Sequence, residues 1–285
     1  MKTEITENTA YFSGDEMNPE IVFECGQAFR FNPRDNGYFG IAHGMPLNVE
    51  KAANGFKIWP VTADAVENTW KRYFTIDKDY CTIKKILSSD EIVKEAIPYC
   101  CGMRLLMQEP FETLITFIIS ANNNIKRIKG IVEKICALSG EAVIYEGEKY
   151  HAFPTPAALA SLSEADLTAC GAGYRAPYIC ETACAVRDGF DLDVIFSMDY
   201  EAARKYLMTL KGVGPKVADC ILLFAFDKQE AFPRDVWIKR VLKTLYDFEP
   251  KNEKELLDFA EKKYSGYGGI AQQYLFHYAR VKKLL

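Results

Sequence analysis

The part of this chain best suited to chemistry is a glycine-rich turn followed by a lysine. Gly212, Val213 and Gly214 precede Pro215, which favours the first position of a helix, and Lys216 comes next. The pattern predicts a helix N-terminus with free backbone N–H groups, an arrangement that binds a phosphate without side-chain charge. An ordinary corner between two helices, with a solvated lysine, would show the same residues. A lysine whose amine is neutral is also a nucleophile.

Two further side chains stand where they could act together with this lysine. Cys220 lies four residues after Lys216, so in a helix over residues 216–226 the two share a face. Asp235 follows 19 residues after the lysine and precedes residues 236–246, which have the periodicity of another helix. An aspartate at that place is also a common helix N-cap, so its position alone fits a structural role equally well.

The elements that must position these residues change in character along the chain. From about residue 21 to residue 61, short apolar runs are separated by Asn36-Gly37 and Asn54-Gly55, pairs that favour tight hairpin turns. We therefore expect an antiparallel sheet, with Ile21-Val22-Phe23 as one of its strands, and then a helix near residues 62–74. Beyond residue 88, runs of helical length and periodicity predominate. The expected helices cover residues 111–120, 125–138, 163–170, 176–188, 200–209, 216–226 and 236–246.

These patterns predict an α+β fold. An N-terminal antiparallel β-sheet lobe, residues 1–95, packs on a larger, mostly α-helical, two-lobed body, residues 96–285. The body contains a helix-hairpin-helix motif at about residues 200–226. The chain of 285 residues is long enough for such lobes to share a substantial core.

Charge and cysteine content narrow the class of protein. The net charge is −4, but residues 201–285 carry 16 Lys and Arg against 11 Asp and Glu, so a basic patch for phosphates is expected there. The chain has no apolar run of about 20 residues and no secretory signal at its start, which predicts a cytoplasmic protein without membrane contact. The nine cysteines include no C-x-x-C pair and none after Cys220. We therefore expect reduced thiols, no metal site, and no iron–sulfur cluster or other cofactor.

The glycine-rich turn, its lysine and the downstream aspartate together resemble the helix-hairpin-helix DNA glycosylases. In this superfamily the hairpin, here Gly212, Val213 and Gly214, grips a backbone phosphate, and the aspartate serves the active site. A lysine at the position of Lys216 resembles the bifunctional members, which release a base and then cut the strand. The resemblance implies that the amine attacks the anomeric carbon and forms a Schiff base, which then undergoes β-elimination. Asp235 would stabilise the sugar cation or assist proton transfer.

Other segments narrow the resemblance to the 8-oxoguanine DNA glycosylases. They occur in order along nearly the whole chain, so their combined specificity is high. The resemblance implies a bifunctional glycosylase and AP lyase that acts as a monomer on double-stranded DNA containing oxidised guanine. The matching segments are residues 25–30 (CGQAFR), 102–112 (GMRLLMQEPFE), 120–128 (SANNNIKRI), 173–176 (GYRA) and 269–276 (GIAQQYLF).

The resemblance assigns base recognition to four positions. Gly26 presents a backbone carbonyl to the N7 hydrogen that oxidised guanine has and guanine lacks. A glycine here could instead have the purely structural role of a bend at the end of a strand. Gln272 reads the Watson–Crick edge of the flipped base, and its alternative is an exposed helical glutamine. Phe276 and Cys220 sandwich the base, although both residue types are most often core residues.

Four more positions match the contacts that the family makes to the DNA left behind. Asn122, Arg127 and Arg175 correspond to the residues that contact the base opposite the lesion. Tyr174 corresponds to the wedge that fills or kinks the emptied stack, which supports the bent duplex. An asparagine run is otherwise an ordinary turn, and a Tyr-Arg pair an ordinary surface pair.

Two positions depart from the family pattern. Trp237 stands where eukaryotic members carry a histidine near a phosphate, and Ile270 replaces a tryptophan before the Ala-Gln pair, so the phosphate grip and pocket rim should differ.

Two other functions fit parts of the sequence. A monofunctional alkylbase glycosylase would use Asp235 without the lysine, and a non-catalytic helix-hairpin-helix protein would only bind DNA.

Overall fold

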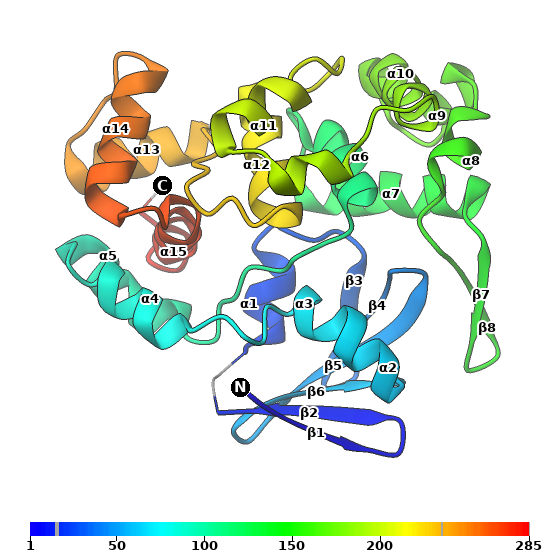
Figure 1. Ribbon diagram of the computed structural model, residues 1–285, viewed down its shortest axis with the longest axis horizontal. Coiled ribbons are helices and arrows are strands. Elements are labelled where there is room, and N and C mark those ends of the chain that lie inside the picture. The colour runs from blue at the N-terminus through cyan, green and yellow to red at the C-terminus, as the bar shows by residue number, and fades with distance from the viewer. Residues whose placement is uncertain (15–16, 235, 285) are drawn as a thin grey trace.

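The computed structural model describes residues 1–14, 17–234 and 236–284, so Asp235 lies outside the described residues. In Figure 1 a six-stranded sheet lies below a helical body, with short helices between them. The predicted α+β class is confirmed.

The N-terminal sheet is antiparallel throughout, with the strand order β1-β2-β6-β5-β4-β3. The hairpins predicted at Asn36-Gly37 and Asn54-Gly55 are present and join β3 to β4 and β5 to β6. Aromatic side chains pack on the sheet, where Phe12 stacks on Phe56 with ring centroids 4.9 Å apart. The strands are β1 (Lys2–Thr6), β2 (Thr9–Ser13), β3 (Phe31–Arg34), β4 (Gly37–Ala42), β5 (Met45–Ala52) and β6 (Gly55–Trp59).

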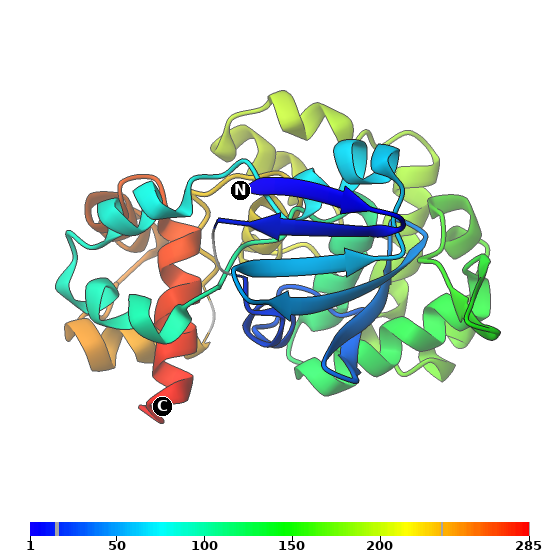
Figure 2. The same ribbon diagram turned by 90° about the horizontal axis from the view of Figure 1, so that it is seen from below.

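Short helices cover the face of the sheet that is turned toward the body, and Figure 2 shows the sheet from its other side. The helix predicted near residues 62–74 is present as three consecutive turns with different hydrogen-bond spacing. These are α2 (Ala63–Ala65), η1 (Val66–Trp70) and α3 (Lys71–Tyr73), and their Trp70 is 1% exposed. They seal the sheet against water.

The expected strand at Ile21-Val22-Phe23 is wrong, because these residues belong to the helix α1 (Pro19–Glu24). Pro19 occupies its first position, and the Asn18 side chain accepts a hydrogen bond from the Glu20 N–H at 3.1 Å. The end of α1 leads directly to Gly26.

The helical body contains all seven helices that the sequence predicts, together with several that it does not. Two of them, α6 and α12, lie side by side at its centre, and nearly every residue of both is buried. The helices are α4 (Tyr80–Leu87), α5 (Glu91–Ala96), η2 (Ile97–Cys100), α6 (Pro110–Ser120), α7 (Ile125–Ser139), α8 (Pro156–Ala160), α9 (Glu164–Ala169), η3 (Gly173–Arg175), α10 (Ala176–Arg187), η4 (Asp193–Ser197), α11 (Tyr200–Leu207), α12 (Pro215–Ala225), α13 (Val236–Tyr246), α14 (Glu253–Tyr264) and α15 (Gly268–Val281).

A second sheet joins the body to the N-terminal lobe. Its strands β7 (Ala142–Tyr145) and β8 (Glu148–His151) form a hairpin that leaves the body after α7 (Figure 1). Tyr145 stacks on Phe39 of the large sheet at 5.3 Å, and its hydroxyl accepts a hydrogen bond from Asn48 Nδ2 at 2.9 Å. This hairpin fixes the sheet against the body at one edge.

The helices α4 and α5, which the sequence places in the N-terminal lobe, pack against the C-terminal helices. Asp90, just before α5, accepts hydrogen bonds from the Tyr246 hydroxyl at 2.7 Å and from Lys263 Nζ at 2.9 Å. The domain boundary at residue 95 stays a prediction. Within the described ranges, no helix has both the length and the apolar character that crossing a bilayer requires.

Candidate active site

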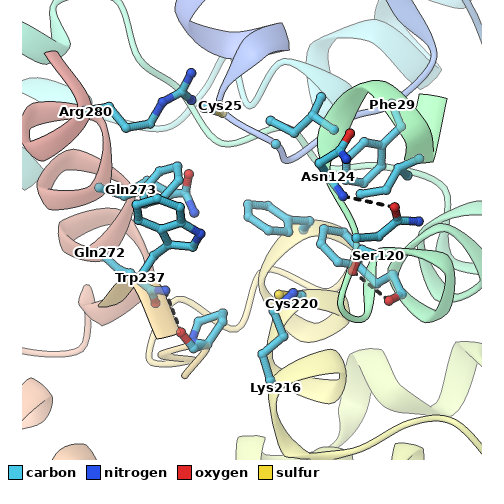
Figure 3. Close-up of a pocket in the computed structure, with 18 of the residues that line it drawn as sticks. Cys25, Phe29, Ser120, Asn124, Lys216, Cys220, Trp237, Gln272, Gln273 and Arg280 are labelled. Atoms are coloured by element: carbon cyan, nitrogen blue, oxygen red, sulfur yellow. Dashed lines mark hydrogen bonds between the residues drawn. The ribbon is translucent and has the colours of Figure 1, made fainter. Parts of the chain in front are cut away.

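A cavity of about 420 Å³ opens where four parts of the chain meet. Helix α15 forms one wall, α6 and the start of α7 form the opposite wall, α12 forms the floor, and the loop after α1 closes the top (Figure 3). The volume falls within the range of about 300–1,000 Å³ that is typical of ligand pockets. The predicted residues that it brings together are Gly26, Lys216, Cys220, Gln272 and Phe276.

Lys216 stands in the first turn of α12, which begins at Pro215 as predicted. Its side chain extends up from the floor toward Cys220, which lies one turn further along the same face (Figure 3). The Nζ of Lys216 lies 5.7 Å from the centroid of the Phe117 ring. Cys220 is 4% exposed. The predicted shared face is therefore confirmed, and the amine reaches into a largely apolar space.

The turn before α12 is held in one conformation by its neighbours. Gly212 has a φ of +81°, and a Cβ there would lie 2.7 Å from the Cβ of Tyr178, so only glycine fits. The Val213 N–H donates to the Leu210 carbonyl at 3.2 Å, so the expectation of a free N–H is wrong for this residue. Gly214 is the N-cap of α12 and no side chain caps it. The helix N-terminus therefore keeps N–H groups for an anion.

Gly26 lies at the top of the cavity in the segment that follows α1. Its φ is +86°, and a Cβ there would lie 3.4 Å from Cδ1 of Ile125. A bend at the end of a strand is thus not the reason for this glycine, because the preceding element is a helix. The left-handed backbone explains why the position needs glycine.

The helix α15 presents Gln272, Phe276 and Arg280 to the cavity at four-residue intervals, on one face. Gln272 is 6% exposed and its Nε2 donates to the Pro233 carbonyl at 2.6 Å, so it is not an exposed helical glutamine. Its Oε1 is buried and has no donor within the described part of the chain. Arg280 Nη1 donates to the Glu24 carbonyl at 3.2 Å and thereby ties α15 to the loop of Gly26.

The charge of this cavity is one-sided. Lys126, Lys216 and Arg280 line it, and among the described residues that line it there is no carboxylate. Burial raises the pKa of the Cys25 thiol to about 11, so this neighbour of Gly26 is neutral, and its Sγ donates to the Val22 carbonyl at 3.3 Å. The described residues contain no cluster of His, Cys, Asp and Glu that would hold a metal ion.

The four remaining predicted positions form a patch outside the cavity lining. Tyr174 is 56% exposed, its hydroxyl donates to the Ala121 carbonyl at 3.3 Å, and Asn122 Nδ2 reaches the same hydroxyl at 3.5 Å. Arg175 is 3% exposed and donates to backbone carbonyls, including that of Asn122 at 3.2 Å. Arg127 is exposed at the start of α7. Their contacts with an opposite base stay a prediction.

Sequence comparison assigns the chain to a family. Residues 11–114 match the N-terminal domain of 8-oxoguanine DNA glycosylases, and residues 115–265 match the HhH-GPD superfamily of base excision DNA repair proteins. The chain belongs to the HhH-GPD superfamily. Together, the two matches confirm the predicted family.

Named relatives of the chain agree with this assignment. A probable N-glycosylase/DNA lyase of Methanothermobacter thermautotrophicus is 41% identical over 204 residues, which are 65% of this chain and 65% of that protein. An N-glycosylase/DNA lyase of Saccharomyces cerevisiae is 34% identical over 254 residues, 75% of this chain and 66% of that protein. The chain thus spans just under two thirds of the length of these curated relatives.

A solved structure resembles the chain over its full length. It is the Clostridium acetobutylicum 8-oxoguanine glycosylase/lyase in complex with double-stranded DNA that contains cytosine opposite 8-oxoguanine. It is 36% identical, covers 99% of both chains and has a TM-score of 0.93.

The two departures from the pattern of the 8-oxoguanine DNA glycosylases have different positions in the structure. Trp237 is 45% exposed and lines the cavity, where Figure 3 shows its indole beside Gln273. Ile270 is 1% exposed in the core and is not among the residues that line the cavity, so the effect of this replacement on the pocket rim stays a prediction. Asp235 lies outside the described residues, and its catalytic role stays a prediction.

Several cavity residues were not predicted from the sequence. Asn124 caps α7 by accepting a hydrogen bond from the Arg127 N–H at 3.0 Å, and this cap places Lys126 at the cavity. The N-cap at Asn124 could be predicted from the sequence, but its position beside the cavity could not. The other residues of this kind include Cys25, Phe29, Phe117, Ser120, Gln273 and Arg280.

Proposed function

We propose that this protein excises 8-oxoguanine from double-stranded DNA and then cuts the strand through Schiff-base chemistry of Lys216. The observation that carries this proposal is the Lys216 amine inside a cavity of base-accepting size, on the first turn of a helix whose N-terminus can hold a phosphate. The relatives named N-glycosylase/DNA lyase support both activities.

In the proposed reaction the lone pair of Lys216 Nζ attacks C1′ of the flipped nucleotide. The bond from C1′ to N9 breaks, its electrons leave with the base, and the base takes up a proton. The sugar ring then opens to an iminium on Nζ. Loss of a C2′ proton breaks the bond from C3′ to its oxygen and releases the 3′ phosphate. The resemblance assigns stabilisation of the sugar cation, or assistance of proton transfer, to Asp235, which lies outside the described residues.

The walls of the cavity suit a flipped oxidised guanine. We propose that the Gly26 carbonyl accepts the N7 hydrogen and that the buried Oε1 of Gln272, which has no donor among the described residues, accepts hydrogens from the Watson–Crick edge. Cys220 and Phe276 supply opposite faces for the ring system. A buried acceptor without a donor favours a ligand that supplies one.

The proposed partner is double-stranded DNA that contains oxidised guanine, bound by one copy of the chain. The cationic cavity mouth and the patch of Asn122, Arg127, Tyr174 and Arg175 support this. We propose that Tyr174, the exposed aromatic residue of this patch, fills the gap in the stack. The proposed chemistry uses side chains alone and requires no cofactor, and the cytoplasm stays the predicted compartment.

The two alternatives make different demands on the site. A monofunctional alkylbase glycosylase activates water and does not require an amine in its cavity. A non-catalytic DNA-binding protein does not require the cavity. The position of Lys216 therefore favours the bifunctional activity over both.

Borohydride trapping tests this proposal on a duplex with 8-oxoguanine opposite cytosine. Reduction of the iminium should leave a covalent protein–DNA adduct with the wild-type chain and none with Lys216→Gln. Lys126→Gln is the matched control, because Lys126 lines the same cavity and its loss should weaken binding without abolishing the adduct. A duplex with unmodified guanine should give no adduct. Trapping that survives Lys216→Gln, or fails with the wild-type chain, would contradict the proposal.

A further inference from the structure

The peptide bond whose carbonyl the proposed function assigns to base recognition joins Gly26 to Gln27. Although Gln27 is polar, it is 1% exposed. Its Nε2 donates to the carbonyls of Val22 at 3.0 Å and Arg104 at 2.9 Å, and its Oε1 accepts from the Leu106 N–H at 2.8 Å. A buried side chain held by three hydrogen bonds keeps its own backbone in one orientation.

Gln108 extends this network to the helix that carries the nucleophile. Its Nε2 donates to the Gln27 carbonyl at 2.6 Å, and its backbone N–H donates to the carbonyl of Phe224, in the last turn of α12, at 2.8 Å. Lys216 stands at the other end of that helix. Hydrogen bonds therefore run without a break from the loop of Gly26 to α12.

Gly26 cannot hold its own carbonyl in place. Glycine has the widest choice of backbone angles of all residues, and this one has a φ of +86°. A Cβ built on Gly26 would lie 3.4 Å from its nearest neighbour, Cδ1 of Ile125, which is an ordinary van der Waals distance. Packing around Gly26 therefore does not fix its backbone. The direction of the carbonyl must therefore be imposed by the residue that follows.

We propose that Gln27 is the positioning residue of base recognition, which holds the Gly26–Gln27 peptide so that its carbonyl receives the N7 hydrogen of the oxidised base. The inference rests on the proposed role of Gly26. Gln27 is not among the residues that line the cavity, so it acts through a neighbour that does, Gly26. Strand cleavage at an abasic site requires Lys216 but no base, and it should therefore not depend on Gln27.

Gln27→Met tests this inference, because it keeps most of the volume and removes all three side-chain hydrogen bonds. Two single-turnover rates are measured, base release from 8-oxoguanine opposite cytosine and strand cleavage at a preformed abasic site. A misplacement of about 1 Å at a reacting group can cost about 100-fold in rate. We expect base release to fall about 10- to 100-fold, while cleavage at the abasic site stays close to the wild-type rate.

A second variant and a control decide the result if Gln27→Met folds poorly. Gln108→Ala removes the bond to the Gln27 carbonyl and should lower base release selectively, by a smaller factor. Asn48→Leu is the control. It removes a buried amide of the same lobe that donates to the Trp59 carbonyl and the Tyr145 hydroxyl, none of which lines the cavity. This variant should lower the Tm without changing the ratio of the two rates.

An unchanged ratio in both Gln27→Met and Gln108→Ala would overturn the inference, since a merely structural role lowers both rates together. A wild-type chain that releases no 8-oxoguanine would instead overturn the proposed function. The two failures are therefore distinguishable.

Discussion

Tyr174 and Arg175 are adjacent in the sequence but have opposite surroundings. The guanidinium of Arg175 is buried and donates to the carbonyls of Ala121, Asn122 and Ala172, so it shapes the turn after α6. Tyr174 is exposed, and its ring lies 4.3 Å from that guanidinium. The arginine thus supports the backbone of Asn122, whose φ is +48°, while the tyrosine faces the solvent. A surface pair, the alternative that the sequence allows, describes only the tyrosine.

Substitution should separate these two roles. Arg175→Met removes the buried hydrogen bonds of the guanidinium to three carbonyls, so the free energy of unfolding should fall by about 2–4 kcal/mol. Tyr174→Ala should cost less than about 1 kcal/mol, because the ring is mostly in water. It should nevertheless slow base release, since the wedge is lost. Urea unfolding and single-turnover excision measure both effects, and a Tyr174→Ala chain with wild-type excision would contradict the wedge.

The sequence predicts a functional residue when local spacing determines its neighbours. Lys216 and Cys220 share a helix face by four-residue spacing, and both line the cavity. Ile270 stands in a matching motif, but its burial depends on how α15 packs, which local spacing does not contain. The burial of Arg175 was equally unpredictable, because two of its partners, Ala121 and Asn122, lie more than 50 residues away in the chain.

At the scale of elements, two hairpins, β1–β2 and β7–β8, were not predicted, and the residues at their turns explain why. The β7–β8 hairpin turns at Glu146 and Gly147, with φ values of +53° and +78°. Gly favours this left-handed conformation, whereas Glu rarely adopts it, so the pair gives a weaker signal than Asn-Gly. Glu7, between β1 and β2, also has a positive φ of 53°. In both places the strand pairing imposes the turn on an unfavourable residue.

The β7–β8 hairpin should stabilise the contact between the two lobes mainly through Tyr145. Tyr145→Ala removes the stack on Phe39 and the hydroxyl that Asn48 reaches, and it should lower the free energy of unfolding by about 1–2 kcal/mol. Amide exchange should become faster in β4 and β5, which carry these partners. Ile144→Ala is the matched control, because Ile144 lies in the same hairpin but is 68% exposed, and should cost about 0.5 kcal/mol or less. Equal costs for both variants would show that the hairpin contributes only its backbone.

For the whole molecule, motifs in order along the chain were enough to predict the fold class and the family. They could not show how the lobes meet, because the partners at that junction are far apart in sequence. Arg30 follows the loop of Gly26 and is 3% exposed, yet its Nε donates to Glu133 of α7 at 3.0 Å and its Nη2 to the His151 carbonyl of β8 at 2.6 Å. The loop of Gly26 is therefore coupled to the body by a buried cation.

A second carboxyl beside this junction makes stability depend on pH. Burial raises the pKa of Glu112 to about 7 from its ordinary 4.5; Arg30 opposes the shift, and Glu109 and Glu133 add to it. The folded chain therefore keeps this proton between pH 4.5 and 7, where the unfolded chain loses it. By linkage, the contribution of Glu112 to stability falls as the pH rises through this window and is lowest above pH 7.

Glu112→Gln should remove this pH dependence, since glutamine is nearly isosteric with the protonated acid and never ionises. At pH 8 the variant should be more stable than the wild-type chain by up to about 3 kcal/mol, and at pH 4.5 the two should be nearly equal. Urea unfolding at both pH values measures the difference. A variant that is less stable at pH 8 would mean that the attraction between Glu112 and Arg30 outweighs the cost of burying the charge, and the raised pKa would then be wrong.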